Sequence, residues 1–123
     1  MRTAALLFVL LAFFSSNGQP KRYTFVFLHH KPAAEKLSKD QVEKLMEGHL
    51  ANIERLAKEG KLVVAGPFEG GGGIFVLNTT SIKEAEEWLS TDPGIQADRW
   101  NVEMLPFSTR IGSLCHAKEP YEM

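Results

Sequence analysis

The chain has 123 residues, and its 14 Lys and Arg against 15 Asp and Glu give a formal net charge of −1 at neutral pH. Its basic residues are scattered along the chain and form no patch, which argues against a nucleic-acid-binding protein. Cys115 is the one cysteine, so no disulfide can form within the chain.

The first 18 residues have the pattern of a secretory signal peptide. Arg2 supplies a positive charge, residues 4–14 are an unbroken apolar run, and residues 15–18 are small or polar. The run is shorter than the ~20 apolar residues that span a bilayer. We therefore expect cleavage, no stable membrane anchor afterwards, and a secreted or periplasmic protein. An uncleaved membrane anchor is the alternative.

The following segments predict a strand, a helix and two more strands. Residues 23–29 are rich in aromatic and β-branched side chains, as strands are. Ser38 opens a Ser-Lys-Asp-Gln capping box and Gly60 is a typical helix stop, so a helix is predicted between them. Residues 61–66 and 73–78 have strand composition, and a glycine-rich turn joins them.

The second half of the chain predicts another helix and a last strand. Ser81 opens a second capping box, and Asp92-Pro93-Gly94 is typical of a helix end. Residues 99–107 alternate like a strand, whereas residues 109–123 show no clear period and are predicted to be a separate tail.

This order of elements predicts an α+β fold over residues 21–108, a ferredoxin-like βαββαβ sandwich. Two short helices can cover only one face of a four-stranded sheet. The strands nevertheless carry apolar side chains on both sides in places, among them Phe25, Phe27 and Trp100. Because a monomer would expose a large apolar patch, we expect a homodimer that buries it.

His49 is the leading candidate for chemistry. At about 100° per residue it falls within an apolar helical stripe, made of Val42, Leu45, Met46, Ile53 and Leu56. A buried ring nitrogen without a partner costs roughly 1–3 kcal/mol. Asp92 is the best-placed partner, because it lies one i+3 step after the apolar stripe of the second helix and therefore points toward the same interior. If the two helices lie side by side, Asp92 holds one nitrogen of His49 and leaves the other for general base or acid catalysis.

Other roles for both residues stay open. A single histidine on an apolar stripe is also the pattern of a core histidine bonded to a backbone carbonyl. A carboxylate after the last turn of a helix meets the negative end of the dipole, at a cost of ~0.3–1 kcal/mol. Asp92 before Pro93 is also typical of a cap on a short turn, and its two oxygens allow both roles at once.

His29 and His30 form a second cluster at the end of the first strand. Adjacent strand residues point to opposite faces, so one of the two is expected at the mouth of a pocket beside His49. No spacing of His, Cys and carboxylates matches a known ligand pattern, so no metal is predicted. A metal-binding barrel that uses His29 or His30 with His49 is a third hypothesis. The glycines at 70–73 do not connect a strand to a helix, as a phosphate loop would, and no cofactor is predicted.

The motifs of this chain together resemble those of the YCII-related (YciI-like) domain. The similar segments span residues 23–107 and include His49-Leu50, Gly60-Lys61-Leu62, Ala65-Gly66-Pro67-Phe68, Asp92-Pro93 and Leu105-Pro106-Phe107. The resemblance implies a ferredoxin-like fold that pairs through its sheets as a dimeric α/β barrel. It also implies an active site at His49 and Asp92 for a lyase- or isomerase-type step on small molecules. Gly66 and Pro67 join His29 and His30 as candidates for lining the substrate pocket.

The leading hypothesis is therefore an exported small-molecule enzyme that uses His49 and Asp92 as an acid/base pair. The alternative is a non-catalytic module of the same fold, which binds a small ligand or assembles with a partner while the pair satisfies a buried polar site. Replacing His49 should abolish turnover in the first case and lower stability in the second.

Overall fold

The computed structural model describes residues 20–110 of the chain. The predicted signal peptide and residues 111–123, which include Cys115, lie outside the described residues. Within the described part, no helix combines the length and the apolar character needed to cross a membrane.

Four strands and three helices make up the described fold, in the order β1 (Arg22–His30), α1 (Lys39–Lys58), β2 (Leu62–Pro67), β3 (Gly73–Leu77), α2 (Ile82–Leu89), α3 (Pro93–Gln96) and β4 (Trp100–Ser108). The strands form one sheet in the order β2-β3-β1-β4, and each neighbouring pair is antiparallel. The predicted α+β, ferredoxin-like arrangement is confirmed.

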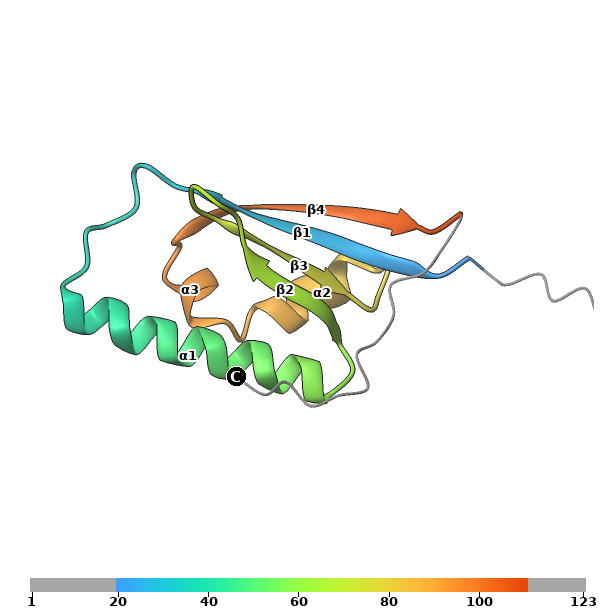
Figure 1. The fold of residues 1–123 in the computed structure, drawn as a ribbon, viewed down its shortest axis with the longest axis horizontal. Helices are drawn as coiled ribbons and strands as arrows, with labels where there is room; N and C mark the ends of the chain where they lie inside the picture. The colour runs from blue at the N-terminus through green and yellow to red at the C-terminus, as the bar shows by residue number, and fades with distance from the viewer. Residues whose placement is uncertain (1–19, 111–123) are drawn as a thin grey trace, which may run out of the picture.

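The helices of the described part all lie against one face of the sheet, and no described helix or strand covers the other face, here called the bare face (Figure 1). Strand alternation sorts the side chains of β1 between the two faces. Val26 and Leu28 are buried under the helices, whereas Phe25 and Phe27 lie on the bare face. The core cluster joins strand residues to α1 and α2 and consists of Val26, Leu28, Leu56, Leu62, Phe75, Leu77, Ala85 and Leu89.

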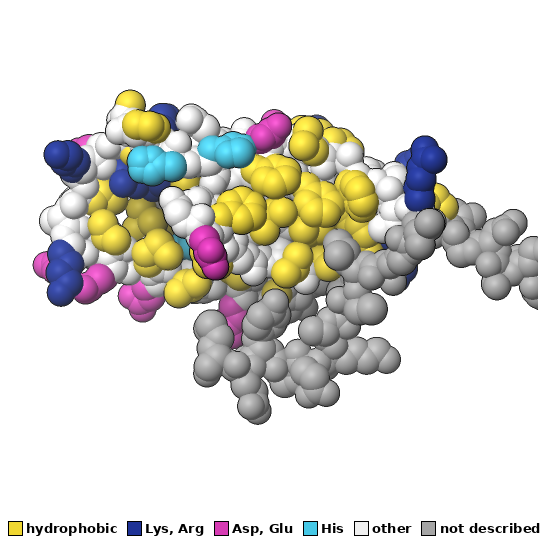
Figure 2. All heavy atoms as spheres, turned by 45° about the horizontal axis from the view of Figure 1, so that its top comes forward, with side chains coloured by type: hydrophobic (Ala, Val, Ile, Leu, Met, Phe, Trp, Pro, Cys, Tyr) yellow, Lys and Arg dark blue, Asp and Glu magenta, His cyan; other side chains and the backbone are white. Residues whose placement is uncertain are grey.

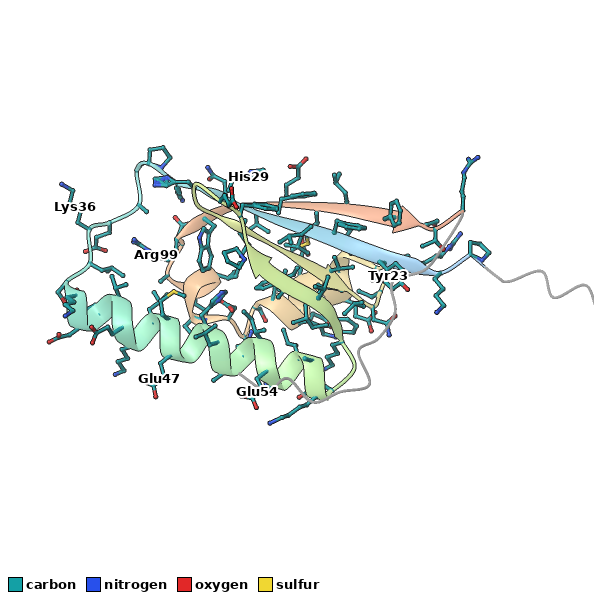
Figure 3. All side chains as sticks on the ribbon, in the orientation of Figure 1. Tyr23, His29, Lys36, Glu47, Glu54 and Arg99 are labelled. Carbon is teal, nitrogen blue, oxygen red and sulfur yellow. The ribbon has the colours of Figure 1, made fainter. Side chains whose placement is uncertain are left out.

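The first helix is capped as the sequence predicts. The Ser38 hydroxyl accepts a hydrogen bond from the Gln41 backbone at 3.3 Å, and the Gln41 side chain accepts one from the Ser38 backbone at 2.8 Å. Gly60 follows the helix with a positive φ of 71°, a conformation that glycine adopts without strain. Glu47 and Glu54 lie on the side of α1 that faces away from the sheet (Figure 3).

The apolar stripe of α1 is only partly in the core, which corrects the sequence prediction. Ile53 and Leu56 pack in the cluster, but Val42 and Met46 remain 42 and 39% exposed. The first turns of α1 extend beyond the end of the strands, so no strand lies above them (Figure 1).

The second predicted helix is also shorter than expected. It ends at Leu89, and a separate short helix, α3, begins at Pro93. Asp92 between them has an extended backbone, with φ −78° and ψ 125°, as the ring of a following proline favours. Asp92 therefore stands at the N-terminus of α3, where the helix dipole favours a negative charge, and not at the C-terminus of α2.

Candidate active site

His49 and Asp92 meet in the layer between the helices and the sheet. Nδ1 of His49, on α1, lies 2.7 Å from Oδ2 of Asp92. The side chain of His49 is 10% exposed and that of Asp92 is fully buried. Because an ionised carboxylate can only accept, Nδ1 carries the hydrogen, and the lone pair of the neutral ring is on Nε2.

The second oxygen of Asp92 caps α3. Oδ1 accepts hydrogen bonds from the backbone of Gly94 at 2.8 Å and of Ile95 at 3.2 Å. The two roles that the sequence left open for Asp92 are therefore both present, one on each oxygen.

Asn52 is a member of this cluster that the sequence reasoning missed. It is buried one turn after His49 on α1, and its amide donates to Oδ2 of Asp92 at 3.3 Å. Its own oxygen accepts from Arg55 at 2.8 Å, which fixes which way the amide points. A polar residue at the i+3 position from His49, within an apolar stripe, is the signal that could have found it.

Arg55 is in turn held at the end of α1 by an exposed carboxylate. Its Nη1 donates to Glu59 at 2.8 Å, and Lys61 lies 2.7 Å from the other oxygen of the same side chain. These hydrogen bonds, Lys61 first and Arg55 second, lower the pKa of Glu59 below its ordinary value. Glu59 therefore stays ionised and keeps the guanidinium of Arg55 in place beside Asn52.

Aromatic side chains enclose the imidazole. The ring centroid of His49 lies 5.8 Å from that of Phe75 and 5.1 Å from that of Trp100. Gly94 makes room for the indole, since a Cβ there would lie 2.1 Å from a ring carbon of Trp100. In this Asp-Pro-Gly segment, Asp92 is the cap, Pro93 is the first residue of α3 and Gly94 leaves the space for Trp100.

Nε2 of His49 makes no hydrogen bond to any of the described residues. Every side-chain nitrogen or oxygen that is buried in this part of the chain has a partner. Nε2 therefore keeps some contact with solvent.

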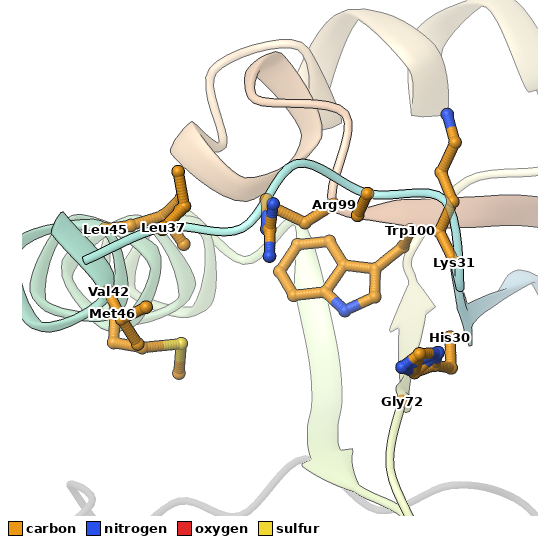
Figure 4. A pocket seen from close by; sticks show the side chains of 10 residues that line it. His30, Lys31, Leu37, Val42, Leu45, Met46, Gly72, Arg99 and Trp100 are labelled. Carbon is orange, nitrogen blue, oxygen red and sulfur yellow. The ribbon is translucent and has the colours of Figure 1, made fainter. Parts of the chain in front are cut away.

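A cavity of about 240 Å³ opens beside Trp100 (Figure 4). It lies between the overhanging turns of α1 and the ends of β1 and β4 and is lined by His30, Lys31, Ala34, Leu37, Val42, Leu45, Met46, Gly72, Arg99 and Trp100. The indole of Trp100 is thus shared between the cavity and His49.

The structure brings one of the four predicted pocket residues to this cavity. His30 lines it, while His29 lies on the bare face of the sheet with Nε2 2.9 Å from Glu103 (Figure 3). The alternation of β1 separates the two rings, as expected. Gly66 and Pro67 are at the end of β2 and do not line the cavity, which touches that hairpin only at Gly72.

The described residues contain no cluster of three His, Cys, Asp or Glu side chains able to hold a metal ion. His29 is on the opposite face of the sheet from His49, so these two rings cannot share one ion within a protomer. The separation applies to His29 alone, and a metal-binding barrel that uses His30 with His49 stays a hypothesis.

The fold is that of a small α+β sandwich protein, and the chain belongs to the YCII-related domain family, whose model matches residues 23–108. Among solved structures it is similar to 5-chloro-2-hydroxyhydroquinone dehydrochlorinase from Burkholderia phenoliruptrix AC1100, determined in complex with 2,5-dihydroxybenzoquinone. That match has a TM-score of 0.53 and 17% identity, and it covers 73% of this chain and 95% of that chain. At this identity the likeness shows the fold alone. No curated protein matches the chain.

Proposed function

We propose that this protein is a small-molecule enzyme in which His49, oriented by Asp92, acts as general base or acid in a lyase- or isomerase-type reaction. One observation carries the proposal: a buried carboxylate holds Nδ1 of His49 while Nε2 has no partner among the described residues. A ring held in this way has one tautomer and one direction in which it can accept a proton.

In the proposed reaction, Nε2 takes a proton from a carbon next to an electron-withdrawing group. In an elimination, the electron pair of that C–H bond then expels a leaving group. In an isomerisation, His49 returns the proton to another carbon of the same molecule. Asp92 stabilises the imidazolium that forms in between. The structural relative is named a dehydrochlorinase, and an elimination of this kind agrees with that name.

The first step can be tested before the substrate is known, because a base that removes a carbon-bound proton also exchanges it with solvent. The protein is incubated in D₂O with a panel of small carbonyl and halogenated compounds, and loss of C–H signal is followed by NMR. We expect exchange with the wild type and a loss of roughly 100-fold or more with His49→Gln, in the range of general base catalysis. His29→Gln, on the opposite face of the sheet, is the matched control and should exchange normally.

The outcome separates the enzyme from the non-catalytic module. Full exchange by a folded His49→Gln variant would rule out the mechanism. If the wild type exchanges nothing in the panel and His49→Gln loses only thermal stability, the pair serves to satisfy a buried polar site, and the protein is a ligand-binding or assembly module.

We also propose that the protein works as an exported homodimer. The apolar bare face of the sheet supports the dimer, and the charge and apolar run of residues 1–18 support export. Expression of the full chain in a secreting host, followed by N-terminal sequencing, tests export. A mature protein that starts after residue 18 is expected, and one that keeps Met1 would contradict cleavage.

A further inference from the structure

The cavity beside Trp100 has an excess of positive charge. Its lining includes His30, Lys31 and Arg99 and no Asp or Glu. The ammonium group of Lys31 is paired with Asp98 and points away from the other lining side chains (Figure 4). A ligand that enters this space therefore meets Arg99 and His30 as its charged or polar neighbours.

Arg99 is held in place and still has donors to offer. One of its terminal nitrogens, Nη1, donates to the backbone oxygen of Glu35. The other nitrogens of the guanidinium have no partner among the described residues, and the group lies beside the indole of Trp100 (Figure 4). A guanidinium with free donors in a half-enclosed space is a binding group for a carboxylate.

The opposite wall of the cavity is apolar. Leu37, Val42, Leu45 and Met46 line it from the overhanging start of α1 and the segment before it. An apolar cavity of about 150 Å³ takes up benzene, so the space of about 240 Å³ has room for a six-membered ring with one polar group. The indole of Trp100 offers a flat surface for such a ring.

We propose that this cavity binds a small carboxylate with a ring-sized apolar body, placing the carboxylate at Arg99 and the ring between Trp100 and α1. The proposal rests on the proposed function, since it names the substrate class for His49, whose ring centroid lies 5.1 Å from that of the same indole.

The test uses benzoate as a non-reactive probe, titrated into the full-length protein by calorimetry and NMR. Benzamide has the same ring without the charge, and acetate has the charge without the ring. We expect benzoate to bind at least about tenfold more tightly than either, because only it engages both walls. The indole N–H signal of Trp100 should shift on binding, and that of Trp88 on α2 should not.

Two variants locate the binding energy. Arg99→Gln should weaken benzoate binding at least about tenfold, since it removes the charge-assisted hydrogen bonds. Arg22→Gln, at the far end of β1, is the matched control and should leave the affinity unchanged. If Arg99→Gln fails to fold, Val42→Asp replaces it, because Val42 is exposed on the cavity wall and a carboxylate there repels the probe.

Equal affinities for benzoate and benzamide would overturn the proposal, and so would an unchanged affinity in the folded Arg99 or Val42 variant. A third contrary result is the absence of saturable benzoate binding up to about 10 mM, a concentration above the Kd of weak ligands. His49→Gln should bind benzoate like the wild type. Failure of the acid/base mechanism in the exchange experiment is therefore separate from failure of the carboxylate site.

Discussion

At the scale of single residues, Asp92 connects the fold to the site. Its two oxygens receive four hydrogen bonds, two from the backbone that starts α3 and two from His49 and Asn52. Asparagine would direct its NH₂ group, which is a donor, at one of these N–H donors. Glutamate has a longer side chain than a capping position allows. The residue that orients the imidazole is thus also the residue that begins α3.

Asn52→Leu tests the polar cluster directly. We expect the free energy of unfolding in urea to fall by about 1–3 kcal/mol, because buried Asp92 and the guanidinium of Arg55 each lose a partner. Asn78→Leu is the control, since its exposed amide makes one long bond of 3.3 Å to Gly60, and it should change stability by less than about 0.5 kcal/mol. Equal losses in the two variants would mean that the cluster adds little to stability.

The two central residues of the site could be predicted because local patterns point to them. His49 interrupts an apolar stripe, and Asp92 precedes a proline, so each stands out within its own segment. The i+3 spacing from His49 marks Asn52, but its role and that of Trp100 depend on contacts with residues about 40 and 50 positions away, which spacing does not show. The cavity was missed for a similar reason: the sequence does not show how far a helix extends beyond the strands it covers.

At the scale of elements, the site depends on how closely α1 approaches α3. Gly48, next to His49, faces Pro93, and a Cβ there would lie 2.9 Å from a ring carbon of that proline. The missing side chain lets the two helices come near enough for the hydrogen bond between His49 and Asp92. The sequence offered α3 only as a short turn capped by Asp92, and it placed the end of the second helix at Asp92-Pro93, whereas α2 ends at Leu89.

Gly48→Val should disturb this contact. We expect it to lower the free energy of unfolding by about 1–3 kcal/mol, as overpacking does, and to reduce proton exchange by His49. Ala51→Val, at an exposed position of the same helix, introduces the same β-branched side chain without the clash and should cost less than about 1 kcal/mol. Thermal and urea unfolding measure both, and a Gly48 variant as stable as the Ala51 variant would show that α3 moves aside freely.

At the scale of the whole molecule, the bare sheet face is the largest feature without a role inside one protomer. Phe27 stacks with Phe68 at a centroid distance of 6.3 Å, and Phe25 meets Phe107 edge-on at 5.0 Å. Leu105 on the same face is 48% exposed. Apolar side chains cover the middle of this face (Figure 2), which is the reason we propose a dimer.

Leu105→Lys should convert the proposed dimer to a monomer, because it places a charge among these rings. Light scattering coupled to gel filtration measures the mass. Leu50→Lys is the control, since Leu50 is 47% exposed on α1, away from the sheet face, and should leave the dimer intact. A wild-type protein that is monomeric at micromolar concentration would contradict the proposal.

The pairing of the first and last strands has a practical consequence for engineering. The backbone of Lys21 donates to the hydroxyl of Thr109 at 3.0 Å, and the backbone of Thr109 donates to Lys21 at 2.9 Å. A fusion partner joined at either point is attached roughly 30 Å from His30, about one strand length away from the cavity entrance. The same closeness makes the domain suited to circular permutation, with new termini cut between Gly70 and Gly71 in the hairpin.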